Sequence, residues 1–144
     1  MKIISTSLLG FILLISGAAC QNKKTPTSSD FTPTPVTSLK TVYFDFDRSA
    51  VRDDQADTLL SNSAVLKDNA GWNVTIEGHC DERGTNEYNM ALGDRRAQST
   101  KTYLINLGND PSKMSTMSYG EERPVGTCHD ESCWWQNRRS DFVK

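Results

Sequence analysis

The chain has no excess of charge of either sign, because 16 basic residues face 18 acidic ones over 144 positions. Both signs are scattered, so the sequence offers no basic surface for a nucleic acid backbone. It contains no catalytic motif and no apolar run long enough to span a bilayer well. Cysteine is scarce, with four positions whose spacing matches no standard zinc motif.

The first 20 residues are typical of a secretion signal. A basic Lys2 precedes an apolar run over residues 3–15, and small residues lead to Cys20. Small residues ending in cysteine resemble a bacterial lipobox, in which the cysteine is acylated and becomes the new N-terminus. Because Gly17 replaces the usual leucine, plain cleavage beside Ala19 and an uncleaved anchor remain alternatives. We expect a signal peptide over residues 1–19 and a lipid on Cys20.

Residues 21–40 have the composition of a flexible linker. Pro26, Pro33 and Pro35 are interspersed with serine and threonine, and large apolar residues are few. We therefore expect one globular domain over residues 41–144. Its length of about 100 residues is enough to bury a core without a metal.

Hydrophobic periodicity predicts an α+β fold for this domain. Val42, Phe44 and Phe46 alternate with polar residues, which predicts a strand over residues 41–47 with one buried face. The further elements expected are a helix from 53 or 54 to about 69, a strand over 72–79, a helix over 86–108, a strand over 114–119, a polar loop to about 136 and a short strand over 138–143. This order favours a two-layer sandwich with helices packed on one face of a small sheet.

Residues 75–96 carry the chemistry of the chain. A strand ends in a polar loop bracketed by Gly78 and Gly84, and the following helix has small residues at the start of its buried row. Asp81 leaves the strand and Arg96 enters the helix beside that row. An acid and a guanidinium on neighbouring rigid elements suit a small zwitterion.

The spacing of these two residues constrains the geometry. In a straight helix from residue 86, Arg96 would lie about 15 Å along the axis. Asp81 can share a ligand with it only if the loop projects outward and the helix runs back past it, or if the helix restarts near Gly93. The alternative role for the pair is a salt bridge that braces the strand–helix connection.

Several motifs in order resemble the OmpA-like peptidoglycan-binding domain, and within it the peptidoglycan-associated lipoprotein branch. They are residues 77–84 (Glu-Gly-His-Cys-Asp-Glu-Arg-Gly), 87–89 (Glu-Tyr-Asn), 92–93 (Leu-Gly), 95–97 (Arg-Arg-Ala), 118–120 (Ser-Tyr-Gly) and 137–139 (Asn-Arg-Arg). The resemblance runs from about residue 42 to 142. It implies a mixed four-stranded sheet and non-catalytic binding of the diaminopimelate side chain of wall peptides. The ligand-binding residues that it implies are Asp81, Arg96, Asp47, Gly84, Thr85, Asn89 and Leu92.

The resemblance also implies a location and partners. Gln21 after Cys20 favours the outer membrane, with the domain in the periplasm. A TolB-like periplasmic protein of the Tol–Pal system is the expected protein partner, and no cofactor is expected. The alternatives are a wall-binding module of another envelope assembly and a metal-dependent wall hydrolase.

The remaining cysteines and charged residues have structural interpretations. Cys128 and Cys133 have four residues between them in a loop of an exported protein, which favours a disulfide and leaves Cys80 as a buried free thiol. A zinc site would need His79, Cys80, Cys128, His129 and Cys133 together. We expect His79 to be a hydrogen-bonded structural histidine, and Arg138 and Arg139 to form structural ion pairs.

Overall fold

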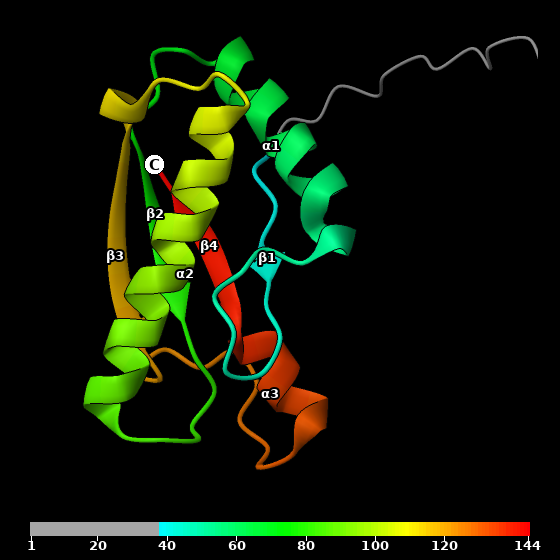
Figure 1. Ribbon diagram of the computed structural model, residues 1–144, viewed down its shortest axis with the longest axis vertical. Helices are drawn as coiled ribbons and strands as arrows, with labels where there is room; N and C mark the ends of the chain where they lie inside the picture. The colour runs from blue at the N-terminus through cyan, green and yellow to red at the C-terminus, as the bar shows by residue number, and fades with distance from the viewer. Residues whose placement is uncertain (1–37) are drawn as a thin grey trace, which may run out of the picture. The chain divides into compact units, whose positions relative to one another are not determined.

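The computed structural model describes residues 38–144 (Figure 1). The predicted signal peptide, Cys20 and most of the predicted linker lie outside the described residues. The elements are β1 (Val42–Tyr43), the 3₁₀ helix η1 (Asp53–Gln55), α1 (Ala56–Asp68), β2 (Val74–His79), α2 (Asn86–Asn106), the 3₁₀ helix η2 (Pro111–Lys113), β3 (Met114–Gly120), α3 (Glu131–Asn137) and β4 (Arg139–Val143).

The four strands form one mixed sheet in the order β1-β4-β2-β3. β2 and β3 are parallel neighbours joined by α2, while β4 runs antiparallel to both β1 and β2. The register places Gly78 of β2 opposite Ser140 of β4. β1 and β4 come from opposite ends of the domain, so their pairing joins the start of the domain to its end and leaves β1 at the edge of the sheet.

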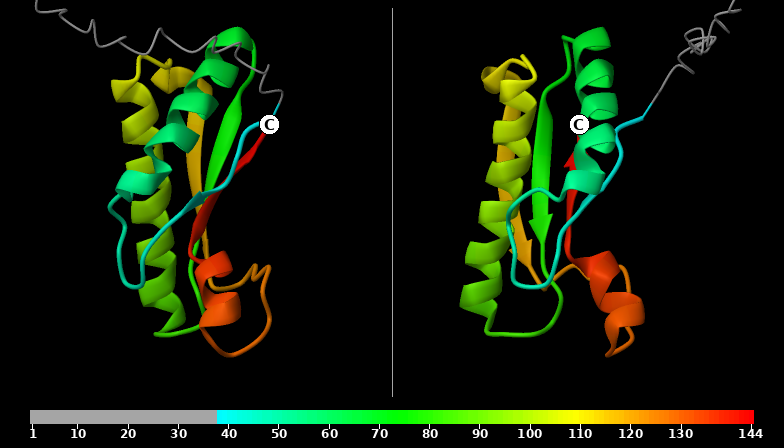
Figure 2. Two further views of the ribbon diagram at one scale, coloured as in Figure 1. Left: turned by 90° about the vertical axis from the view of Figure 1, so that its right-hand side faces the viewer. Right: turned by 45° about the vertical axis from the view of Figure 1, so that its right-hand side comes forward.

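Two helices cover one face of the sheet. Figure 2 shows α1 and α2 on the same side, with α3 beyond the end at which β2 finishes. The core lies between these layers and consists of Val42, Phe44, Leu59, Ile76, Ala97, Leu104 and Met114. The predicted α+β sandwich, with a mixed four-stranded sheet and helices on one face, is confirmed. Within residues 38–144, no helix combines the length and the apolar character needed to cross a membrane.

Helix α2 approaches the sheet closely at two glycines. A Cβ atom on Gly78 would lie 1.9 Å from the Gly93 carbonyl oxygen, and one on Gly93 would lie 2.3 Å from Ser118 Oγ. The small residues of the α2 row therefore allow backbone contact between α2 and β2. This contact brings the following turn of α2, which carries Arg96, against the end of β2.

Two local predictions differ from the structure. The first strand covers only residues 42 and 43, and Phe46 is 53% exposed, so the prediction that it faces the core is wrong. Asp47 follows in the left-handed region at φ 54°, where regular strand pairing cannot continue. Part of the predicted polar loop is the helix α3, whose N-cap Asp130 accepts a hydrogen bond from Ser132 N.

We predict that Gly78→Ala lowers the free energy of unfolding by about 3 kcal/mol or more, because the new methyl group overlaps the α2 backbone. Gly71→Ala is the control, since a Cβ there meets nothing within 4 Å. Urea unfolding of both variants measures the difference. A Gly78 variant as stable as the Gly71 variant would contradict the close packing of α2 on β2.

Candidate ligand-binding site

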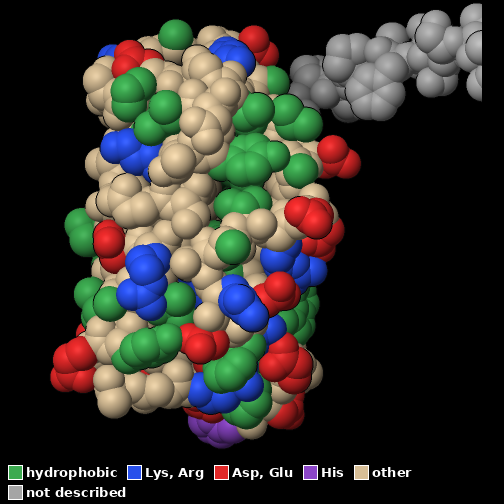
Figure 3. Space-filling model, in the orientation of Figure 1, with side chains coloured by type: hydrophobic (Ala, Val, Ile, Leu, Met, Phe, Trp, Pro, Cys, Tyr) green, Lys and Arg blue, Asp and Glu red, His purple; other side chains and the backbone are tan. Residues whose placement is uncertain are grey.

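A cleft of about 220 Å³ opens between three segments. They are the turn after β1, the loop over residues 80–85, which we call the binding loop, and the first turns of α2. The residues that line the cleft are Phe46, Asp47, Cys80, Asp81, Arg83, Gly84, Tyr88, Asn89, Leu92 and Arg96. Figure 3 shows that basic and acidic side chains interleave on the face in view, without a broad area of one sign.

Arg96 forms the base of the cleft and is 1% exposed. Its guanidinium donates to three backbone carbonyls: Nε to Arg48 at 2.9 Å, Nη1 to His79 at 2.7 Å and Nη2 to Asp45 at 3.1 Å. Nη1 also lies 3.4 Å from Cys80 Sγ. Because a guanidinium has five N–H donors, one on Nη2 remains for another acceptor.

The charge of Arg96 is not neutralised by a carboxylate. Among the described residues, none of the ion pairs within 4.0 Å includes Arg96. Burial lowers the pKa of the guanidinium from its ordinary value, but arginine stays protonated in proteins. A buried cation that is bonded only to neutral acceptors favours an anionic ligand in the cleft.

Asp81 lies in the same cleft but pairs with other arginines. It is 4% exposed, and its Oδ2 accepts from Arg83 Nη2 at 2.6 Å and from Arg138 Nη1 at 3.2 Å. Its Oδ1 accepts from the backbone N–H of Arg83 at 3.1 Å, which makes a tight turn of the binding loop. Burial acts to raise the pKa of Asp81, but the hydrogen bonds from Arg83 and Arg138 outweigh it and lower the pKa.

The structure therefore does not contain the Asp81–Arg96 salt bridge that was the alternative role for this pair. Both side chains line one cleft, and the helix reaches it in the first of the two shapes predicted above. α2 is continuous over residues 86–106 and runs back past the end of β2, where Arg96 meets the His79 carbonyl.

Arg83 crosses the mouth of the cleft between two aromatic rings. Its guanidinium carbon lies 3.8 Å from the centre of the Phe46 ring and 4.1 Å from the centre of the Trp134 ring. None of Arg83, Phe46 and Trp134 was among the predicted ligand residues. The signal for Arg83 was the Asp81-x-Arg83-Gly84 order, which is typical of an aspartate turn. No sequence signal identified the two rings.

Asp47 closes the cleft from the opposite wall. Its carboxylate accepts a hydrogen bond from the Tyr88 hydroxyl, which comes from the first turn of α2. Asp47 itself has a positive φ, and this backbone conformation places its carboxylate at the rim. Such backbone strain in a non-glycine residue is found most often at functional sites. Tyr88 is 46% exposed and was not among the predicted ligand residues.

The other predicted ligand residues divide into two groups. Asn89 and Leu92 are buried in the wall of the cleft, and Gly84 turns the binding loop at φ 118°. Thr85 is not among the residues that line the cleft. Its hydroxyl caps α2 by accepting from Tyr88 N at 3.2 Å, a role typical of a threonine just before a helix.

The OmpA family model matches residues 43–137, which include every residue that lines the cleft. The chain belongs to the OmpA family. Within this family it is similar to proteins named peptidoglycan-associated lipoprotein. The relative from Mesorhizobium japonicum is 37% identical over 150 residues, which cover 92% of this chain and 88% of the relative. The relative from Brucella melitensis is 47% identical over 120 residues, which cover 83% and 70%.

A solved structure agrees with the sequence comparison. The crystal structure of the peptidoglycan-associated lipoprotein from Burkholderia pseudomallei has 41% sequence identity and a TM-score of 0.72. The similarity covers 80% of this chain and 96% of that one. The solved structure and the family model therefore agree on the OmpA-family fold of this chain.

The cysteines of this OmpA-family domain have distinct roles. Cys128 and Cys133 are joined in a disulfide, so neither thiol can bind zinc in this state. Cys80 is a buried free thiol whose Sγ lies 3.3 Å from the Asn89 carbonyl oxygen. Burial raises the pKa of Cys80 to about 11, although the positive charge of Arg96 opposes the shift. The Cys80 thiol is thus neutral at physiological pH.

Two arginines near the end of the chain are paired, as expected. Arg138 bonds to Asp81 and Glu131, and Arg139 Nε donates to Asp141 Oδ2 at 2.7 Å. Arg138 therefore also helps to hold the acid of the cleft. This second role follows from its contact with Asp81 and had no signal in the sequence.

His79 differs from its prediction. It is 1% exposed on the sheet face opposite the helices, and neither ring nitrogen has a hydrogen-bond partner among the described residues. Its ring stacks on Tyr119, and Nε2 lies 3.8 Å from Asp141 Oδ2. Burial and the positive charge of Arg139 lower its pKa to about 4, so the ring is neutral at pH 7. The expected hydrogen bonds are wrong because burial, stacking and neighbouring charges hold this ring instead.

We predict that His79 makes the domain sensitive to acid between pH 6.5 and about 4. In this window the unfolded chain binds a proton at His79 and the folded protein does not, so stability falls as the pH falls. His79→Phe removes the titration and keeps a ring against Tyr119. The parent should lose about 3 kcal/mol more stability than the variant between pH 7 and pH 4. Equal losses in chemical denaturation at the two pH values would refute the prediction.

Proposed function

We propose that this OmpA-family domain binds peptidoglycan without catalysis, through the diaminopimelate side chain of the wall peptides. The observation that carries the proposal is Arg96, a buried guanidinium at the base of an open cleft with no carboxylate partner among the described residues. One of its N–H donors remains unused and would receive the terminal carboxylate of the ligand. The names of the relatives support peptidoglycan as the wider target.

The ammonium of the same ligand side chain needs an acceptor nearby. Asp81 and Asp47 supply carboxylates on two sides of the cleft. Asp81 is already bonded to Arg83 and Arg138, so the ammonium would share its oxygens with Arg83 or displace that side chain. Among the described residues, the Asp47 carboxylate is bonded only to the Tyr88 hydroxyl, a neutral donor that exchanges at lower cost.

The walls of the cleft favour a chain of methylene groups between these polar ends. Leu92 and the Phe46 ring supply apolar surface, and Gly84 leaves room in the binding loop. Diaminopimelate has this arrangement, since methylene groups separate its terminal amino acid centre from the peptide. A lysine side chain at the same position in a wall peptide has the ammonium and lacks the carboxylate, so it would leave Arg96 without an anion.

We further propose that the chain links the outer membrane to the wall. A lipid on Cys20 would anchor the chain after removal of residues 1–19, residues 20–40 would form the linker, and the domain over residues 41–144 would bind the wall in the periplasm. A TolB-like protein of a Tol–Pal system is the proposed protein partner. No specific observation favours another envelope assembly or a wall hydrolase.

Sedimentation with wall sacculi tests the function. The purified protein should sediment with sacculi that contain diaminopimelate and remain in solution with sacculi that carry lysine at that position. Free meso-diaminopimelate should release the bound protein. Equal binding to both walls would refute recognition of the second carboxylate, and soluble wall fragments after incubation would show hydrolysis.

A substitution at the base of the cleft tests the role of Arg96. Arg96→Lys keeps the charge but loses the planar fork, and we expect wall binding to weaken by about tenfold or more. The variant should also be less stable, because three carbonyl contacts depend on the fork. Binding is therefore compared well below the melting temperature of the variant, with the exposed Arg95→Lys as the control. A folded Arg96→Lys protein with the affinity of the parent would assign Arg96 to the fold alone.

A further inference from the structure

The tip of the binding loop is held from the side by the turn that leads into α3 and by α3 itself. Trp134 Nε1 donates to Glu82 Oε1 at 2.9 Å, and His129 Nδ1 lies 2.8 Å from Glu82 Oε2. The Glu82 side chain is 44% exposed, so burial does not fix it. Its position depends on these two contacts with residues far away in the sequence.

Trp134 links this contact to the cleft. The same indole that bonds Glu82 also packs against Arg83, and Arg83 is bonded to Asp81 inside the cleft. Glu131, three residues before Trp134, lies 3.7 Å from the Arg83 guanidinium. A movement of the start of α3 would therefore be passed to Asp81 in the cleft through the Arg83 side chain.

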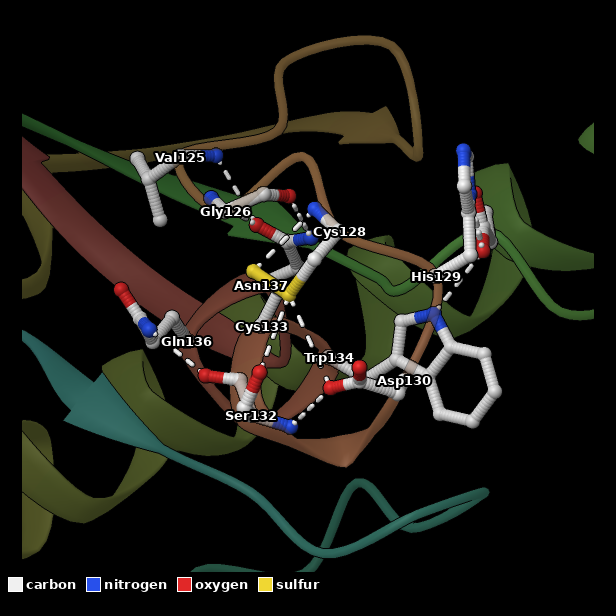
Figure 4. Close-up of a disulfide and its surroundings, with 11 residues drawn as sticks. Val125, Gly126, Cys128, His129, Asp130, Ser132, Cys133, Trp134, Gln136 and Asn137 are labelled. Carbon is white, nitrogen blue, oxygen red and sulfur yellow. Dashed lines mark hydrogen bonds and ion pairs between the residues drawn. A yellow bond between two sulfur atoms is a disulfide. The ribbon is translucent and has the colours of Figure 1, made fainter.

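The disulfide lies at the base of this segment. Figure 4 shows that Cys128 and Cys133 close a short turn that contains His129, with Trp134 directly after it. The backbone N–H of Cys128 lies 3.1 Å from Cys133 Sγ. Asn137 braces the preceding residues, because its amide oxygen accepts from Val125 N at 2.8 Å and Gly126 N at 3.0 Å.

Beyond the Asp130 cap and the Asn137 brace, the turn depends on its cross-link for order. α3 has only seven residues and would be marginal without packing or a cross-link. The His129 side chain is 82% exposed, so it has no burial of its own. A disulfide that closes the turn reduces the conformational entropy that the turn must lose to hold His129 and Trp134 together.

We propose that the Cys128–Cys133 bridge positions the binding loop for its ligand by holding His129 and Trp134 against Glu82. Residues 129 and 134 are thus positioning residues, and Glu82 is the point at which they act. This inference rests on the proposed function, because the readout is affinity for a diaminopimelate-containing wall peptide. The bridge raises affinity by ordering the loop and makes no contact with the ligand.

A set of variants tests the contact with the full chain, and the probe is a soluble wall peptide that ends in meso-diaminopimelate. Glu82→Ala removes both contacts, and Trp134→Phe keeps the ring under Arg83 but removes the indole N–H. We expect each to weaken binding by about three- to tenfold, the range of one or two exposed hydrogen bonds. Asp68→Ala, which removes one exposed acid at the end of α1, should bind like the parent.

A double-mutant cycle tests whether the bridge acts through Glu82. Cys128→Ser with Cys133→Ser should weaken binding by a similar factor in the parent and cause no further loss in the Glu82→Ala background. An equal loss in both backgrounds would overturn the proposal, as would parent-like affinity of Glu82→Ala. If the serine variant does not fold, the Glu82 and Trp134 variants still decide whether the contact matters, since both keep the bridge.

The parent protein separates the two proposals. Failure of the parent to bind the wall peptide would refute the proposed function. Binding by the parent, with unchanged affinity in Glu82→Ala and Trp134→Phe, would refute the positioning role alone.

Discussion

The fold of this domain depends on one buried cation. Arg96 is held by carbonyl oxygens from residues 45, 48 and 79, which belong to the turn after β1 and to the end of β2. These contacts fasten the first strand region to α2 and shape the base of the cleft at the same time. Because the acceptors are neutral, the charge remains available to a ligand.

The glycine contact between α2 and β2 makes this arrangement possible. With Gly78 and Gly93 in backbone contact, α2 lies close enough for an arginine one turn later to reach the end of the strand. Larger residues at these positions would lift α2 away from the sheet. The guanidinium would then lose its carbonyl partners. The packing of α2 on the sheet and the geometry of the candidate site therefore depend on the same glycine contact.

Much of the fold follows from periodicity. The two long helices, the strand of residues 74–79 and the cap at Thr85 could be predicted, because each has a local pattern or a capping residue. The path of α2 past the end of β2 could be narrowed to two shapes from helix geometry alone. Phe46 could not be placed, because alternation predicts a buried face only while the chain stays extended, and Asp47 ends that conformation.

For the candidate site, the sequence predicted which residues line the cleft better than it predicted which of them form ion pairs. The acid and the guanidinium do line one hollow, but Asp81 bonds to Arg83 and Arg138 in place of Arg96. These partners depend on α3 and β4, which reach the cleft only through the tertiary fold. The short helix α3 had no periodic signal, since a seven-residue element is set by its cap and its cross-link.

The attachment of β1 has a mechanical consequence for the proposed tether between membrane and wall. Tension from the chain before residue 38 would enter the domain at β1, which is two residues long and, within residues 38–144, pairs with β4 alone. A few residues after β1, the backbone carbonyls of Asp45 and Arg48 accept hydrogen bonds from Arg96. In the proposed tether, the route of the load from membrane to wall is therefore short. It runs along β1 at one edge of the sheet and leaves β3, at the opposite edge, unloaded.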